Sequence, residues 1–146
     1  MMRKVSCPSE QDWTALKHVA RYLLALPRVV MNYPWAPLGN DLDVYVDANW
    51  AGCVRTRKST LGGAVLLDGS LLKAWSKTMP VLALSSGESE LAAVTKGASE
   101  GLGIQASLRD FGHAVRLRIL SDATAAIGIC RRQGLGRVRH LATADL

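Results

Sequence analysis

Residues 42–47 have the sequence LDVYVD, which is the starting point for predicting the fold. Its apolar residues Leu42, Val44 and Val46 alternate with the others, and a period of two is typical of a β-strand with one buried face. The run ends on a carboxylate, Asp47. We therefore expect a strand that carries an acidic group at its end.

The residues that follow predict the rest of the core. Two apolar runs, 61–67 and 70–76, are separated by Asp68-Gly69, a pair that favours a tight hairpin. A helix is expected over 85–102, because Ser85 and Glu88 have the spacing of a capping box and apolar residues then recur with helical spacing. A fourth strand at 115–119 leads to Asp122 and a helix at 123–130. This order predicts an α/β or α+β domain with a mixed sheet.

A helical segment precedes this core. Ser9 and Asp12 have capping-box spacing, and apolar residues then repeat with helical spacing to Ala25. The prolines of residues 27–37 indicate a loop that runs to Asn40. We therefore divide the chain into a helical preface, 1–40, and a core domain, 41–146.

Composition limits the classes of protein that need to be considered. The 146 residues suit one core, 49% of them are hydrophobic, and no run approaches the ~20 apolar residues of a membrane span. A formal charge of +6 favours a polyanionic partner such as nucleic acid. Cys7, Cys53 and Cys130 are widely spaced, which predicts buried, reduced thiols in an intracellular protein rather than disulfides or a zinc site.

Three acidic residues are candidates for metal-dependent phosphodiester chemistry. Asp47 ends the first strand, Asp122 follows the fourth, and Glu90 lies one turn inside the helix between them, so a compact fold can bring them to one sheet end. Hydrolysis with two metal ions needs several converging carboxylates. The alternatives are that Asp122 is only the N-cap of the next helix and that Asp47 only starts a turn with Asn49.

The helix start contains two glutamates, and their positions predict different roles. Glu88 has the position that accepts backbone N–H groups at a helix start. Glu90 is therefore the better metal-ligand candidate, and small residues on adjacent turns, Ala93 and Gly97 among them, would let the helix approach the sheet.

Basic residues flank these acids. They are Arg55, Arg57 and Lys58 after the first acid, and Arg131, Arg132, Arg137 and Arg139 after the last. Such runs are usually solvated faces, but here their positions favour contacts with phosphate groups.

Several of these motifs, in this order, are similar to the ribonuclease H region of copia-type (Ty-family) retrotransposon polyproteins. VDANWAGC at 46–53 resembles the family's first acidic motif, with Asn49 in place of its second acid. RKSTLGG at 57–63, AWSK at 74–77, ALSSGESEL at 83–91 and SDATAAI at 121–127 resemble later segments of the family. The segment from Trp13 to Tyr22 resembles the connection from reverse transcriptase to ribonuclease H.

The resemblance implies a fold and an activity. It implies a ribonuclease H-like mixed sheet whose first three strands are antiparallel, with helices packed on it. It also implies an endonuclease that hydrolyses the RNA strand of RNA–DNA hybrids with two Mg²⁺ or Mn²⁺ ions, downstream of a reverse transcriptase in the same polyprotein. The expected location is the cytoplasm, the nucleus or a virus-like particle, with no membrane partner.

The resemblance also assigns roles to residues. The implied catalytic and metal-binding residues are Asp47, Glu90, Asp122 and Asp145. The expected nucleic-acid contacts are Arg55, Arg57, Lys58, Ser85, Ser86, Arg137, Arg139 and His140.

One position departs from the family's pattern. The family has an acid after its Lys-His-Ile motif, whereas Ala142 follows Arg139-His140-Leu141 here. Asp145 lies three residues further on and could substitute, since helical spacing leaves it near the same face. The alternatives are a weakened ribonuclease H-like module that binds nucleic acid, or a nuclease of the same fold that acts on DNA.

Overall fold

The computed structural model of the chain describes residues 7–33, 35 and 37–132. The chain forms two compact units, Met1–Tyr33 and Pro34–Leu146. Within the described ranges, no helix combines the length and the apolar character that are needed to cross a membrane.

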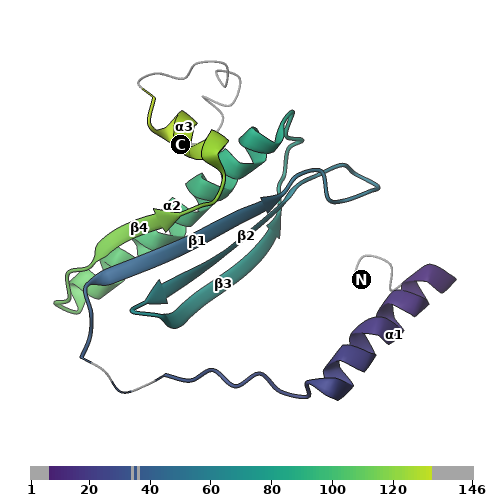
Figure 1. Ribbon diagram of the computed structural model, residues 1–146, viewed down its shortest axis with the longest axis horizontal. Helices are drawn as coiled ribbons and strands as arrows, with labels where there is room; N and C mark the ends of the chain where they lie inside the picture. Colours follow the sequence, from purple (N-terminus) through teal and green to yellow (C-terminus); the bar gives the residue numbers. More distant parts are fainter. Residues whose placement is uncertain (1–6, 34, 36, 133–146) are drawn as a thin grey trace. The chain divides into compact units, whose positions relative to one another are not determined.

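The first unit contains helix α1 (Glu10–Ala25) (Figure 1). Ser9 is its N-cap, and both halves of the predicted capping box are present: the Asp12 N–H donates to the Ser9 hydroxyl, and the Ser9 N–H donates to the Asp12 carboxylate over 2.9 Å. None of the residues of α1 is buried. Its stability as described therefore rests on local contacts such as this cap.

The second unit is built on a four-stranded sheet with the order β3-β2-β1-β4 (Figure 1). Strands β1 (Asp41–Asn49), β2 (Thr60–Leu67) and β3 (Ser70–Thr78) are antiparallel neighbours, and β4 (Arg116–Leu120) pairs in parallel with β1. Asp68 and Gly69 have φ angles of 45° and 78°, which is the positive-φ pair of a tight hairpin turn. The predicted mixed sheet is confirmed, and the α/β arrangement is that of a ribonuclease H-like fold.

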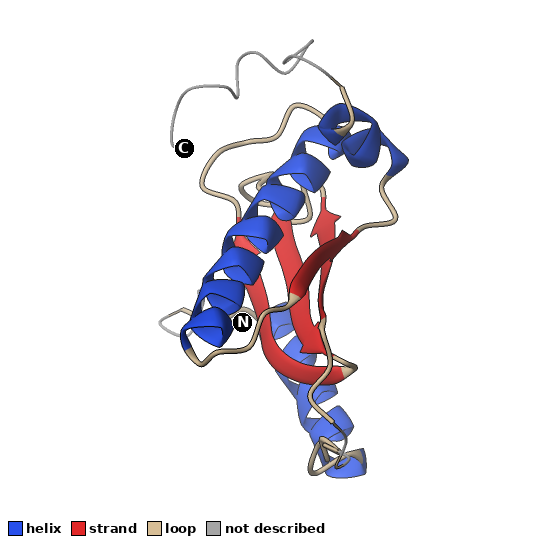
Figure 2. Cartoon of the chain, turned by 90° about the vertical axis from the view of Figure 1, so that its left-hand side faces the viewer, coloured by secondary structure: helices blue, strands red, loops and turns tan. Residues whose placement is uncertain are grey.

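Helix α2 (Ser86–Asp110) packs on one face of this sheet (Figure 2). Leu42, Val44 and Val65 are fully buried beneath it, as the alternation of β1 predicted. The helix lies very close to β1, because a Cβ added at Gly97 would stand 2.3 Å from Cγ1 of Val46. The predicted close approach at Gly97 is therefore confirmed.

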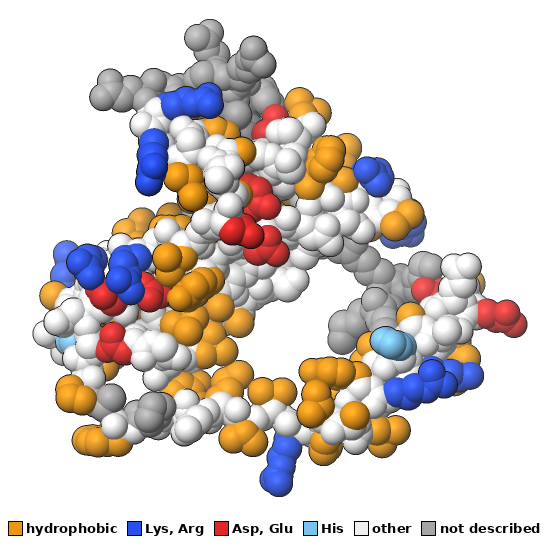
Figure 3. Space-filling model, in the orientation of Figure 1, with side chains coloured by type: hydrophobic (Ala, Val, Ile, Leu, Met, Phe, Trp, Pro, Cys, Tyr) orange, Lys and Arg blue, Asp and Glu red, His pale blue; other side chains and the backbone are white. Residues whose placement is uncertain are grey.

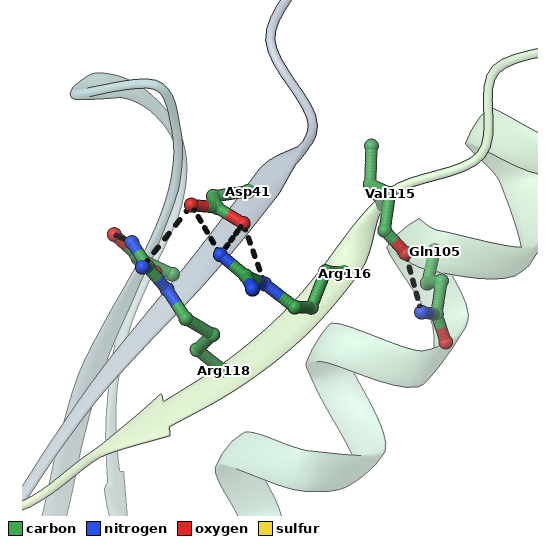
Figure 4. Close-up of polar contacts among 6 residues, drawn as sticks. Asp41, Gln105, Val115, Arg116 and Arg118 are labelled. Carbon is green, nitrogen blue, oxygen red and sulfur yellow. Dashed lines mark hydrogen bonds and ion pairs between the residues drawn. The ribbon is translucent and has the colours of Figure 1, made fainter.

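Strand β4 is shorter than β1 and is held at its start by ion pairs (Figure 4). The Arg116 guanidinium donates to both oxygens of Asp41, and Arg118 donates to Asp43 over 2.6 and 2.7 Å. The β4 pairing ends at Tyr45 of β1, so the last residues of β1 have no partner from β4. This open edge of β1 is where the candidate site lies.

Two predictions from the sequence need correction. Helix α2 runs to Asp110, eight residues beyond the predicted end at Leu102, because the apolar residues Ile104 and Leu108 continue to pack on the core. The three cysteines are free, but Cys7 and Cys130 are exposed and Cys53 is half-buried, so the expectation of buried thiols was wrong.

Candidate active site

The Glu90 carboxylate is the central group of the candidate site. Glu90 lies near the start of α2 and is half-buried. Its Oε2 atom is buried and has no hydrogen-bond partner among the described residues, and the backbone of Ala48, near the end of β1, acts on the same carboxylate by lowering its pKa. A buried carboxylate oxygen without a partner is costly unless a proton or a cation is bound to it.

Two further carboxylates act on Glu90 from the strand ends. Burial raises the pKa of Glu90, and the negative charges of Asp47 and Asp122 raise it further, while the backbone of Ala48 lowers it. Asp47 and Asp122 are themselves exposed. Figure 3 shows acidic side chains gathered on this face, near the end of β1 and below α3 (Thr124–Cys130). The structure therefore brings all three predicted acids close enough to influence one another.

A cavity opens beside these groups. It has a volume of about 1050 Å³, and its lining includes Asp47, Asp122 and Arg131. Most of its remaining lining is apolar or glycine, such as Val94 from α2 and Ile127 from α3. A few carboxylates in the lining of a mostly apolar cavity are common in ligand-binding and catalytic sites.

The acids fit a divalent cation in the kind of ligand that they offer. Carboxylate oxygens are the ligands that Mg²⁺ and Mn²⁺ prefer. Among the residues that the structure describes, no group of three or more His, Cys, Asp or Glu side chains is arranged to hold an ion as it stands. Carboxylates repel one another without a neutralising cation. The unpartnered Oε2 of Glu90 is the observation that fits a cation at this place.

The structure resolves one alternative that the sequence left open and tests the predicted role of Glu88. The N-cap of α3 is Ala123, and no side chain caps that helix, so Asp122 is not an N-cap there. The Glu88 carboxylate accepts the Leu84 N–H over 2.7 Å, and the Ser85 hydroxyl accepts the Glu88 N–H over 3.2 Å. The predicted capping role of Glu88 is confirmed: its carboxylate accepts a backbone N–H at the helix start, that of Leu84, which directly precedes the N-cap Ser85.

The chain is similar to a protein that carries the name of a secreted effector. It is 36% identical over 97 residues to secreted RxLR effector protein 161 of Plasmopara viticola, a match that covers 66% of this chain and 68% of that protein. The chain belongs to the same family as this protein. No protein-family model matches the chain.

The other similar proteins include retrotransposon Pol polyproteins. The chain is 28% identical over 138 residues to the retrovirus-related Pol polyprotein from transposon TNT 1-94 of Nicotiana tabacum. It is 31% identical over 142 residues to that from transposon RE2 of Arabidopsis thaliana. Each match covers 92% of this chain, but only 10% and 9% of the two polyproteins. The chain thus spans about a tenth of the length of each of these two polyproteins.

The predicted nucleic-acid contacts have different environments. Arg55 and Arg57 are exposed, and neither has an ion-pair partner within the described part of the chain. Lys58 is half-buried, and its ammonium donates to the Pro80 carbonyl. Ser85 is exposed at the N-cap of α2.

The remaining predicted residues are one in α2 and four beyond Arg132. Ser86 is exposed in the first turn of α2. The predicted residues Arg137, Arg139, His140 and Asp145 lie outside the residues that the structure describes.

Trp50 had no role predicted from the sequence, and Arg131 was predicted only as a general phosphate contact without a place in a cavity. Trp50 donates from its indole N–H to the Ala83 carbonyl over 3.2 Å, and Arg131 lines the cavity. Trp50 follows Asp47 by three residues, and an aromatic residue just after an acidic strand end was the signal that could have found it. Arg131 was recognised only as part of a basic run.

Proposed function

We propose that this chain hydrolyses the RNA strand of RNA–DNA hybrids, using two Mg²⁺ or Mn²⁺ ions, as part of a retrotransposon Pol polyprotein that also has a reverse transcriptase upstream. The observation that carries the proposal is the Glu90 carboxylate, whose buried oxygen has no partner in the described part of the chain and whose pKa is raised by burial and by Asp47 and Asp122. A carboxylate with a raised pKa beside two carboxylates that line a cavity is typical of catalytic sites. The resemblance of the ordered motifs to copia-type ribonucleases H supports the choice of substrate.

The residues of the site have distinct roles in this proposal. Asp47, Glu90 and Asp122 would hold the ions, with Asp145 as the fourth ligand expected from the sequence. Such ions, when bound, activate water and neutralise charge that develops on the phosphate. The half-buried Glu90 would be the most rigid ligand, because it lies on helix α2, which packs very closely on β1. The exposed carboxylates of Asp47 and Asp122 would face the nucleic acid.

Positive charge near the acids would bind the backbone of the hybrid. Arg131 lines the same cavity as Asp47 and Asp122, and a guanidinium there offers a bidentate contact for a phosphate. Arg55 and Arg57 lie in the loop that follows β1 and would bind phosphates further along the strand.

The test is cleavage of a labelled RNA–DNA hybrid in the presence of Mg²⁺, beside duplex DNA and single-stranded RNA. We expect cleavage of the RNA strand of the hybrid alone, and loss of at least about 100-fold in Asp47→Asn, because metal-based catalysis depends on each ligand. Asp110→Asn is the matched control, since Asp110 is an exposed acid at the far end of α2. Cleavage of duplex DNA at a similar rate, or equal activity in Asp47→Asn and the wild type, would refute the proposal.

A weakened ribonuclease H-like module that binds hybrids is the second candidate, and Ala142 is the observation that favours it. Under that alternative, Ala142→Asp raises cleavage and Asp145→Asn has no effect. If Asp145 is instead the fourth ligand, Asp145→Asn reduces cleavage and leaves hybrid binding largely intact. The two variants therefore separate the two candidates in one assay.

A further inference from the structure

The loop between β1 and β2, residues 50–59, is tied to the segment 79–85 that leads into α2. The Trp50 indole N–H donates to the Ala83 carbonyl over 3.2 Å, and the Met79 N–H donates to the Ser59 carbonyl over 2.8 Å. The Lys58 ammonium adds a third bond, to the Pro80 carbonyl. The two segments therefore form one surface at this end of the sheet.

Hydrogen bonds within residues 50–59 also stabilise the conformation of this loop. The Arg57 N–H donates to the Cys53 carbonyl over 2.6 Å, and the Cys53 N–H donates to the Lys58 carbonyl over 3.1 Å. The Ala51 N–H donates to the hydroxyl of the fully buried Ser59 over 3.1 Å. Ala51 and Arg57 have φ angles of 50° and 54°, which are costly for residues other than glycine and persist only where the surroundings enforce them.

The exposed side of this surface mixes apolar and basic side chains (Figure 3). Trp50 is 47% exposed although its N–H is engaged, while Val54 and Leu84 are 87% and 74% exposed. Arg55 and Arg57 lie in the same loop and are exposed. An exposed aromatic face in the same loop as arginines that have no ion-pair partner among the described residues is a combination that proteins use to bind nucleic-acid strands, where the arginines contact phosphates and the ring packs on a sugar or base.

We propose that this surface is a docking site for the minor groove of the hybrid and that Trp50 is a binding residue there, its indole face packing against a ribose. The proposal rests on the proposed function, because it takes the hybrid as the ligand. Paired bases of a duplex offer a side chain only groove edges and sugars, and the minor groove of an A-like helix is wide and shallow enough to admit an indole. Trp50 lies three residues beyond Asp47, so this surface adjoins the end of β1 that carries that acid.

The experiment measures hybrid binding by fluorescence anisotropy in an Asp47→Asn background, so that cleavage does not consume the ligand. We expect Trp50→Ala to weaken hybrid affinity about tenfold, as is typical for loss of an aromatic contact with nucleic acid. Trp50→Phe keeps an aromatic face but loses the N–H bond to Ala83, and it should retain most of the affinity. Trp35→Ala is the matched control, because Trp35 is a fully exposed tryptophan outside this surface.

Three results would overturn the proposal: unchanged hybrid affinity in Trp50→Ala, an equal loss in Trp50→Phe, or an equal loss with B-form duplex DNA. An equal loss in Trp50→Phe would mean that the bond to Ala83, and not the ring, carries the effect. If the chain cleaves no hybrid but Trp50→Ala still weakens hybrid binding, the proposed hydrolysis fails and the docking site stands. If cleavage occurs and Trp50→Ala binds and cleaves normally, the docking site fails and the hydrolysis stands.

Discussion

Replacing Gly97 with alanine tests whether α2 lies as close to β1 as the structure has it. The added Cβ would stand 2.3 Å from Cγ1 of Val46 and 3.2 Å from Cγ1 of Val44. Both valines are buried, and a β-branched side chain has no other rotamer that is easily reached, so neither can move aside. The helix must therefore shift away from the sheet.

The expected cost follows from two opposing effects. Overpacking of a dense core costs about 1–3 kcal/mol, and the rigid valines place Gly97→Ala at the upper end of that range. Alanine stabilises a helix interior by about 1 kcal/mol relative to glycine. The net loss in free energy of unfolding is therefore about 2 kcal/mol, which corresponds to a fall in Tm of roughly 8 °C.

Gly103→Ala is the matched control on the same helix. An added Cβ at Gly103 meets nothing within 4 Å, so only the helix propensity changes and this variant should be about 1 kcal/mol more stable. The assay is urea denaturation of both variants beside the wild type. If Gly97→Ala is as stable as Gly103→Ala, then α2 does not pack against Val44 and Val46 as described. Because Glu90 lies seven residues before Gly97 on the same helix, Gly97→Ala should also weaken Mg²⁺ binding.

The remaining predictions concern charged groups. The pKa of Glu90 is raised in the folded state, so its negative charge lowers the free energy of unfolding as the pH rises above 4.5. Glu90→Gln should therefore raise the free energy of unfolding at pH 7 without Mg²⁺ by on the order of 1 kcal/mol. Thermal melts that show the same stabilisation at pH 3 would contradict this. Lys73 and Lys96 lower the pKa of Glu100 to about 2, so its contribution is present above pH 4.5 and is lost as the pH falls towards 2. Glu100→Gln should lower the free energy of unfolding at neutral pH by only about 1 kcal/mol, because solvent screens the ion pair with the half-exposed Lys73. Urea denaturation near pH 2 should show no difference from the wild type. Arg55→Gln should reduce the slope of log affinity for hybrid against log salt concentration by about 0.9, and an unchanged slope would show that Arg55 is only solvated.

Local patterns were sufficient to place the strands, the start of α2 and the candidate acids, but not the end of α2. The alternation at 42–47 predicted β1, the Asp68-Gly69 pair predicted the hairpin, and the spacing of Ser85 and Glu88 predicted the start of α2. These features depend on neighbours within a few residues, because strand period, turn φ angles and helix caps are local properties. The order of the acids along the chain likewise pointed to one end of the sheet.

Contacts between distant segments decided the rest. The burial of Glu90 depends on how closely α2 packs on β1, and the bonds from Trp50 to Ala83 and from Lys58 to Pro80 join segments that are 33 and 22 residues apart. No local pattern encodes such contacts, because burial and long-range hydrogen bonds arise only when the sheet and the helix have packed together. The acidic and basic candidates could be identified from the sequence alone. Tertiary packing decided which carboxylate is desolvated and which basic side chains stay exposed.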